Sequence, residues 1–139
     1  MHPLVNRAMD ILQYSYAPYS GFTVAAALQT TSGKVFGGCN VENASYPAGI
    51  CAERSAIAAA VSAGFQTFDA IAVVGGCSGK VTDFCPPCGV CLQVMSEFFS
   101  PSTRIILYNG REEKVLLFSE LLPYGFSCDQ LTGKRGEQE

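Results

Sequence analysis

Apolar residues recur with two different periods along this chain. One is the period of an amphipathic helix: in residues 3–14 the apolar side chains fall at positions 4, 5, 8, 11 and 12. Further helices are expected where alanine-rich or apolar segments run into a glycine or a proline. The predicted helices span residues 3–14, 50–63, 88–99 and 119–122.

The second pattern is that of short strands. A continuous apolar run at 68–75 predicts a buried strand, and the segments on either side of Thr30-Thr31-Ser32-Gly33 read as a hairpin. The predicted strands span residues 22–29, 34–39, 68–75, 104–108 and 114–118. This order of elements predicts a three-layer α/β/α sandwich with a mixed five-stranded sheet, in which the third and fourth strands are parallel across a right-handed helical crossover.

Length and composition indicate one globular domain. The chain has 139 residues, of which 48% are hydrophobic, enough for a core within a single unit. We expect this domain to occupy residues 1–131, and the polar segment 132–139 to be disordered. No apolar run approaches the roughly 20 residues of a membrane span. The first ten residues lack the layout of a signal peptide, so a cytoplasmic protein is expected.

The charge of the chain argues against nucleic acid as a partner. The net charge is −3, the isoelectric point is near 5.1, and the basic residues are scattered. Binding to a phosphate backbone relies on clustered lysine and arginine. A small, weakly charged substrate fits this composition better than a polymer.

Three cysteines with an acid beside them are the strongest chemical signal. Cys51 is followed two residues later by Glu53, and Cys88 and Cys91 are separated by two residues. A structural zinc site typically has four protein ligands, whereas a catalytic zinc has three and keeps a position for water. The lone histidine, His2, lies at the chain end and is expected to be exposed rather than a ligand. The pattern therefore predicts a metal that activates water.

The positions of these cysteines in the predicted helices favour ionised thiols. Cys51 falls at the start of one helix, and Cys88 and Cys91 fall at the start of another. A helix N-terminus presents free N–H groups and partial positive charge, which stabilise thiolates. Two such ends directed at one ion would form a preorganised metal site.

The other cysteines have weaker interpretations. Seven cysteines cannot all pair, and Cys39, Cys77 and Cys128 are expected to be small buried apolar residues. Cys85 could form a rival pair with Cys88, but two prolines stand between them. Cys88 and Cys91 are the better pair, because Gly89 between them would permit close backbone approach.

These motifs resemble a known group of enzymes. Cys51-Ala52-Glu53-Arg54 with the later Pro87-Cys88-Gly89-Val90-Cys91 is similar to the zinc-dependent nucleoside and base deaminases. Two further segments narrow the resemblance to the free-nucleoside cytidine deaminases, and the similarity runs from residue 8 to residue 127. These segments are Asn40-Val41-Glu42-Asn43-Ala44-Ser45-Tyr46-Pro47 and Tyr16-Ala17-Pro18-Tyr19-Ser20-Gly21-Phe22.

The resemblance implies an activity and a cofactor. Cytidine and 2′-deoxycytidine would be deaminated hydrolytically to uridine and 2′-deoxyuridine, in pyrimidine salvage. Cys51, Cys88 and Cys91 would hold one zinc per chain, and zinc-bound hydroxide would attack C4 of the cytosine. Glu53 would shuttle protons from the water to ring N3 and to the departing ammonia.

The resemblance also assigns binding residues. Asn40 and Glu42 would bind the ribose hydroxyls, Phe22 would pack against the pyrimidine, and the backbones of Ala44 and Ala52 would meet polar groups of the substrate. Arg54 would offset the negative charge of the thiolates, the more so because Leu92 occupies a position where family members often carry arginine. Family members form homotetramers with shared sites, to which Tyr46 and Phe126 would contribute.

Three alternatives remain open from the sequence. A deaminase of a blasticidin-type nucleoside antibiotic shares the zinc motifs, although Glu42 argues against it. A non-catalytic zinc or redox module could use Cys88 and Cys91, although Glu53 would then have no role. Deamination of tRNA or DNA is disfavoured by the charge of the chain.

Overall fold

The computed structural model describes residues 1–132, which fold around one mixed five-stranded sheet with the order β2-β1-β3-β4-β5. The strands are β1 (Phe22–Thr30), β2 (Val35–Cys39), β3 (Phe68–Cys77), β4 (Arg104–Tyr108) and β5 (Glu113–Leu117). The helices are α1 (Pro3–Leu12), α2 (Ala52–Ser62), α3 (Gly89–Phe98), α4 (Phe118–Leu121) and α5 (Cys128–Thr132), with a 3-10 turn η1 at Tyr46–Ala48. Only β3 and β4 pair in parallel within this sheet, so the predicted mixed sheet and the parallel pairing of its third and fourth strands are confirmed.

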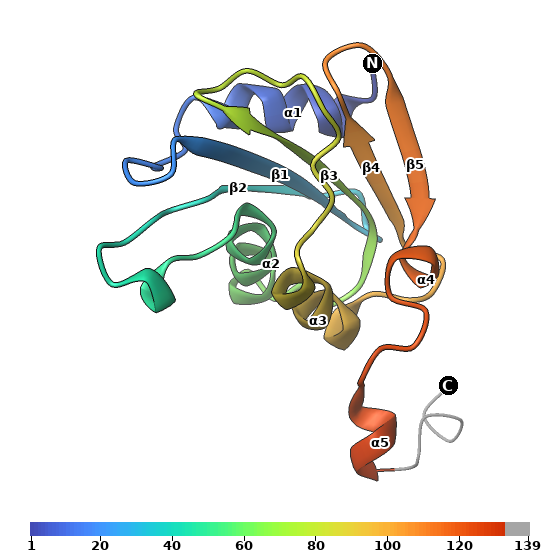
Figure 1. Cartoon of the computed structure of the whole chain (residues 1–139). Helices are drawn as coiled ribbons and strands as arrows, with labels where there is room; N and C mark the ends of the chain where they lie inside the picture. Colours follow the sequence, from blue (N-terminus) through green and yellow to red (C-terminus); the bar gives the residue numbers. More distant parts are fainter. Residues whose placement is uncertain (133–139) are drawn as a thin grey trace.

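The helices cover both faces of the sheet, which makes three layers (Figure 1). Successive residues of a strand point to opposite faces, and the two cores use alternate positions of β1. Ala25 and Ala27 pack with α1 on one face, whereas Ala26 and Leu28 pack with α2 and α3 on the other. The three-layer α/β/α architecture expected from the pattern is therefore confirmed.

Close packing of α2 on the sheet depends on Gly38 in β2. A methyl group at this position would lie 2.6 Å from the Ala52 carbonyl oxygen and 2.6 Å from the Ala56 nitrogen. The first turn of α2 therefore rests directly on the backbone of β2. This contact therefore fixes the position of Cys51, the residue immediately before α2.

Several local expectations were wrong. Cys77 and Cys128 are exposed rather than buried, and Cys39 is half-buried. His2 is half-buried, and its ring Nδ1 accepts a hydrogen bond from the Leu4 N–H at 3.0 Å, so the histidine caps α1. Gly89 has open space around it, so close approach does not explain its presence.

The C-terminal segment also differs from the expectation. Thr132, assigned to a disordered tail, ends the short helix α5, which the sequence pattern did not predict. The remainder of that tail, 133–139, lies outside the described residues. No helix within residues 1–132 is both long enough and apolar enough to span a membrane.

Candidate active site

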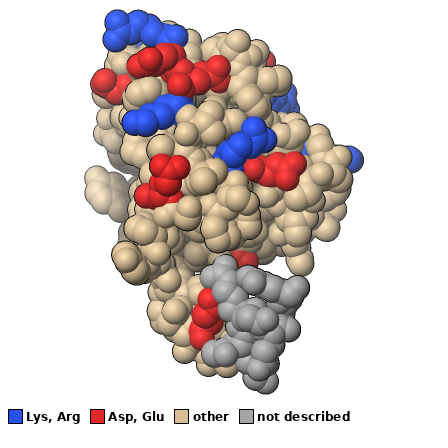
Figure 2. All heavy atoms as spheres, turned by 90° about the vertical axis from the view of Figure 1, so that its right-hand side faces the viewer, with Lys and Arg blue, Asp and Glu red and all other residues tan. Residues whose placement is uncertain are grey.

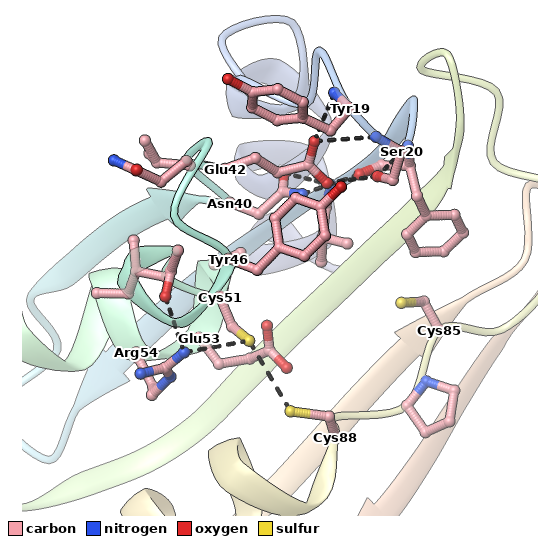
Figure 3. A pocket seen from close by; sticks show the side chains of 18 residues that line it. Tyr19, Ser20, Asn40, Glu42, Tyr46, Cys51, Glu53, Arg54, Cys85 and Cys88 are labelled. Atoms are coloured by element: carbon pink, nitrogen blue, oxygen red, sulfur yellow. Dashed lines mark hydrogen bonds between the residues drawn. The ribbon is translucent and has the colours of Figure 1, made fainter.

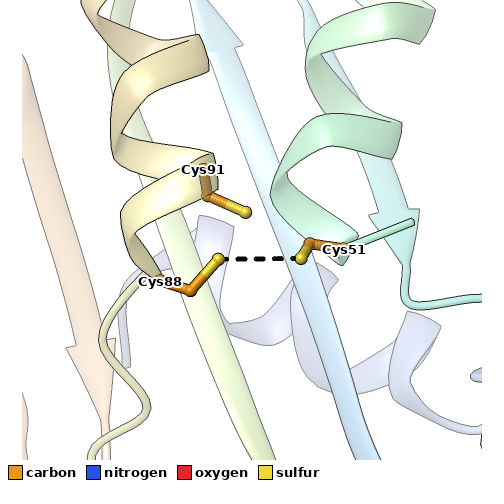
Figure 4. Close-up of side chains that lie close together, drawn as sticks. All are labelled: Cys51, Cys88 and Cys91. Atoms are coloured by element: carbon orange, nitrogen blue, oxygen red, sulfur yellow. Dashed lines mark hydrogen bonds between the residues drawn. The ribbon is translucent and has the colours of Figure 1, made fainter. Parts of the chain in front are cut away.

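The three predicted ligand thiols converge at the ends of two helices (Figure 4). Cys51 is the N-cap of α2, Cys88 is the N-cap of α3, and Cys91 lies in the first turn of α3. Their sulfur atoms all lie within 4.8 Å of one another. The structure therefore brings together the three residues that the sequence assigned to a metal.

The donor set fits a tetrahedral metal. Sulfur ligands bound to zinc at about 2.3 Å in tetrahedral geometry lie about 3.8 Å from each other. The Sγ atoms of Cys51 and Cys88 are 3.8 Å apart. Three thiols leave the fourth coordination position open, and Cys51 and Cys88 both line a cavity. These residues fit a zinc ion that keeps one position for water or substrate.

The thiols of α3 have different protonation tendencies in the metal-free chain. Burial opposes ionisation of Cys88, but hydrogen bonds from the Val90 and Cys91 backbone and from neighbouring thiols outweigh it and lower its pKa. Burial, followed by the negative charge of Glu53, raises the pKa of Cys91. Binding of a cation to all three thiols would therefore release protons.

Glu53 lies in the first turn of α2, next to the thiols, and is only 4% exposed. Burial raises the pKa of its carboxyl, while its own backbone N–H, the Cys91 thiol and the charge of Arg54 act in the opposite direction. The side chain lines the same cavity as Cys51 and Cys88. A buried acid next to three converging thiols and an open cavity is suited to proton transfer.

Arg54, the residue after Glu53, lines the same cavity and contacts one of the three thiols. Its Nη2 donates to the Cys51 sulfur at 3.7 Å and to the Gly49 carbonyl at 3.5 Å. The hydrogen bond to Cys51 is the main reason that the pKa of the Arg54 guanidinium is raised. Leu92 is half-buried and packs against the main core, so its side chain adds no charge to the site. The predicted charge compensation by Arg54 has a direct contact to support it.

A cavity of about 670 Å³ opens beside the thiols (Figure 3). Its lining includes five of the predicted substrate residues: Phe22, Asn40, Glu42, Tyr46 and Ala52. Phe22 is 40% exposed there, which argues against a core role. Ala44 and Phe126 are not among the lining residues of this single chain.

Asn40 and Glu42 occupy their positions through hydrogen bonds to the N-terminal loop. Glu42 accepts from the backbone N–H groups of Tyr19 and Ser20 at 2.9 and 3.1 Å, and from the Ser20 hydroxyl. The Ser20 hydroxyl is the main cause of a lowered pKa of the Glu42 carboxyl. Asn40 donates to the Phe22 carbonyl at 2.8 Å and accepts from the Val24 N–H at 2.9 Å and from the Ser15 hydroxyl. Asn40 therefore ties its loop to β1, Glu42 ties it to the segment before β1, and both residues line the cavity.

Sequence reasoning missed several lining residues. Ser20 and Tyr19 hold Glu42, and the Tyr19 ring packs edge-on against the Tyr46 ring at 6.2 Å. Cys85 also lines the cavity, and burial, followed by the negative charge of Glu53, raises its pKa to about 11. The Tyr16–Phe22 motif pointed to the loop of Tyr19 and Ser20, but no sequence signal placed Cys85 in the wall.

Comparison with protein families agrees with this geometry. Residues 2–107 match the family model described as the cytidine and deoxycytidylate deaminase zinc-binding region. The chain is 40% identical over 131 residues to a cytidine deaminase of Sporosarcina psychrophila, covering 93% of each chain. It is also 40% identical over 129 residues to a cytidine deaminase of Halalkalibacterium halodurans, covering 92% of this chain and 95% of that one.

Solved structures show the same similarity. The crystal structure of a cytidine deaminase from Burkholderia pseudomallei superposes with a TM-score of 0.82 at 44% identity, covering 91% of this chain and 100% of that chain. The cytidine deaminase of Mycobacterium tuberculosis superposes with a TM-score of 0.74 at 34% identity, covering 89% and 94%. The resemblance stated from the motifs is confirmed.

Proposed function

We propose that this chain, which belongs to the cytidine and deoxycytidylate deaminase family, hydrolyses cytidine and 2′-deoxycytidine to uridine and 2′-deoxyuridine with release of ammonia. The reaction would serve pyrimidine salvage. The observation that carries the proposal is the convergence of three thiols and one buried acid on a single open cavity. A reaction that replaces an amino group by a hydroxyl needs an activated water and a proton carrier. The three thiols would hold a metal that activates the water, and the buried acid would carry the proton.

Cys51, Cys88 and Cys91 would hold one zinc per chain. When bound, a zinc ion supplies Lewis acidity that makes water a better nucleophile near neutral pH. A divalent ion with three thiolates still carries net negative charge, which weakens this effect. The Arg54 guanidinium, hydrogen-bonded to the Cys51 sulfur, offsets part of that charge.

Glu53 would move protons between water, ring and leaving group. Its carboxylate takes a proton from the attacking water and passes it to N3 of the cytosine. The oxygen first adds to C4. Glu53 then takes the second proton, from the hydroxyl now on C4, and delivers it to the amino nitrogen, so that the C4–nitrogen bond breaks, ammonia leaves and the C4 carbonyl of the uracil ring remains. Burial shields these transfers from bulk solvent.

The rest of the cavity would recognise the nucleoside. Asn40 and Glu42 lie at the cavity edge, where they would bind the ribose hydroxyls, and Phe22 would pack on the pyrimidine. The backbones of Ala52 and Ala44 would meet polar groups of the substrate. Glu42 is also the residue that disfavours a nucleoside antibiotic as substrate, because the pattern of the antibiotic deaminases lacks this Asn-x-Glu pair for binding the sugar.

We further infer a homotetramer with sites shared between subunits. Tyr46 is 77% exposed and Phe126 is 55% exposed in the single chain. Large exposed apolar side chains often mark interfaces. Tyr46 lies at the cavity, and Phe126 is held beside α3, where the Gln93 side chain donates to its carbonyl at 2.9 Å. A partner subunit would supply the Phe126 ring to this cavity.

Other substrates and roles have less support. The net charge of the chain is −3 and its basic residues are scattered along the sequence, and on the face shown in Figure 2 acidic and basic side chains are interspersed. A nucleic-acid substrate would be expected to need such a stripe. A purely structural or redox zinc module would not need a buried acid in an open cavity. A free nucleoside remains the substrate that the site accommodates best.

The proposal can be tested on the purified chain. We expect about one zinc per chain and loss of ultraviolet absorbance when cytidine is added, both abolished by a chelator and restored by zinc. Cys88→Ala should lose metal and activity together, whereas Cys77→Ala, which removes a thiol outside the triad, should keep both. Full activity in a metal-free protein would contradict the mechanism.

A further inference from the structure

A second cavity, of about 370 Å³, lies next to the candidate active site. It is lined by Gly75, Gly76, Cys77 and the loop that leads from β3 towards α3. Among the described residues, only Phe22 and Cys85 line both cavities. These two side chains therefore form the partition between them.

The Cys85 side chain fills its part of the partition tightly. A methyl group at Gly75 would lie 2.8 Å from the Cys85 sulfur and 3.2 Å from its Cβ. Gly75 lines the second cavity and not the first, so it supports Cys85 from behind. The Cys85 thiol packs against the Gly75 backbone on one side and faces the active-site cavity on the other.

The proposed reaction determines how the cytosine ring must be oriented in the active-site cavity, so this step rests on the proposed function. C4 must face the three thiols, and N3 must face Glu53, which delivers its proton. C5 is the other ring neighbour of C4, so it must point away from Glu53. Figure 3 shows Glu53 entering from α2 and Cys85 entering from the opposite side, on the loop before α3. C5 therefore points towards the Cys85 wall.

We propose that Cys85 sets the size of the C5 substituent that the site accepts, and that the second cavity is the space such a substituent enters when this wall is reduced. The ligands concerned are cytosine nucleosides that carry an alkyl group at C5, and the uridine products that correspond to them. The thiol is a small side chain in a partition between two cavities. Removal of the Cys85 thiol would join the two cavities, whereas a larger side chain at this position would narrow the active-site cavity.

The test compares substrates that differ only in size at C5. The ratio of kcat/KM for 5-ethylcytidine to that for cytidine is measured for the zinc-loaded wild-type protein, Cys85→Ala and Cys85→Val. A pocket change of about one methylene alters such discrimination roughly 10- to 200-fold. We expect Cys85→Ala to raise the ratio by about tenfold, and Cys85→Val to lower it.

A second pair of variants acts on the same wall from behind. Gly75→Ala should press the sulfur into the active-site cavity and lower the ratio. The double variant Gly75→Ala/Cys85→Ala should raise the ratio again, because the 2.8 Å contact with the sulfur is gone and only the 3.2 Å contacts with the Cβ of residue 85 and the Thr23 carbonyl oxygen remain. Cys77→Ala is the matched control. It removes a thiol that lines the second cavity only, so the partition and the ratio should stay unchanged.

Binding of the products gives a readout independent of turnover. The dissociation constants of uridine and 5-ethyluridine are measured by calorimetry, and their ratio should follow the same order among the variants. If wild-type protein deaminates cytidine but Cys85→Ala leaves both ratios unchanged, or Cys77→Ala changes them equally, the inference is overturned. If no variant deaminates cytidine or binds uridine, the proposed function itself fails and the inference fails with it.

Discussion

At the scale of single residues, the proposed reaction depends on one buried carboxyl. Glu53 is 4% exposed and lines the same cavity as the Cys51 and Cys88 thiols. An acid withdrawn from water in this way usually has a functional reason, because burial of a charge without a role is costly. Glu97, on α3, is exposed and offers the comparison of an acid without such surroundings.

Glu53→Gln should separate metal binding from catalysis. The amide keeps the size and most hydrogen bonds of the carboxyl but cannot carry protons, so kcat should fall by roughly 10²- to 10⁴-fold. Zinc content, measured by metal analysis, should stay near that of the wild type. Glu97→Gln is the matched control and should behave as wild type. A loss below tenfold in Glu53→Gln would reassign Glu53 to a structural role.

Arg54 is the second residue whose loss should be severe. Its guanidinium donates to the Cys51 sulfur, and a hydrogen bond to a charged group contributes about 1.5–3 kcal/mol, or roughly 10- to 100-fold in activity. Arg54→Gln should show this loss, and Arg54→Lys, which keeps the charge, should lose less. Leu92→Arg should partly rescue Arg54→Gln by returning a cation to the site.

The rescue is measured as a coupling energy. The kcat/KM values of the wild type, both single variants and the double variant form a cycle whose departure from additivity is the coupling between positions 54 and 92. Strictly additive effects would show that the two positions do not share the neutralising role.

At the scale of secondary-structure elements, the site depends on where two helices begin. The N-termini of α2 and α3 carry all three thiols, so a shift of either helix changes the distance between the sulfur atoms. The position of α2 is set by its contact with β2 at Gly38. The arrangement of the three candidate ligand thiols is thereby linked to a glycine outside the candidate metal site.

Gly38→Ala should therefore weaken both the fold and the metal site. The added methyl meets α2 backbone, which has no free rotation to relieve the overlap, and overpacking of this kind typically reduces stability by about 1–3 kcal/mol. Zinc affinity should fall in parallel, as judged by competition with a chelator, and chemical denaturation gives the stability.

Gly89→Ala is the control, because its methyl enters open space at the start of α3, even closer to the ligands. It should be neutral, or more stable by up to about 1 kcal/mol from helix propensity. If Gly38→Ala retained wild-type stability and zinc affinity, the α2 contact would not control the site.

At the scale of the whole molecule, the single chain leaves apolar side chains exposed at its C-terminal end. Tyr124 is 99% exposed and Phe126 is 55% exposed, and the segment from α4 to α5 extends away from the sheet (Figure 1). Such a surface is consistent with the proposed tetramer, in which closed symmetry would repeat one interface in every subunit.

Complementation between inactive chains tests the shared site. Chains with Glu53→Gln are mixed with chains with Phe126→Ala under conditions of subunit exchange, which is verified by mass. In random tetramers about one site in four would contain an intact Glu53 and an intact Phe126 from different chains, so activity should return. Activity equal to the sum of the two parents, with exchange confirmed, would contradict shared sites.

The order of elements and the cluster of cysteines with its acid could be predicted from local sequence alone. Hydrophobic periodicity is a local property, so it located α1, α2, α3 and all five strands to within a few residues. The spacings around Cys51, Glu53 and Cys88 are local as well. A helix start is read from neighbouring residues, and placing each thiol at such a start was enough to predict a metal site.

The surroundings of that centre depend on tertiary packing. Cys85 and Ser20 come from two loops without periodicity, and the contact of Ser20 with Glu42 depends on how distant segments meet. Exposure is likewise a property of the whole fold, which is why Cys77 and Cys128 could not be told from buried cysteines by their neighbours. The ligands lie on regular elements that local sequence specifies, whereas the cavity walls are assembled by packing between elements.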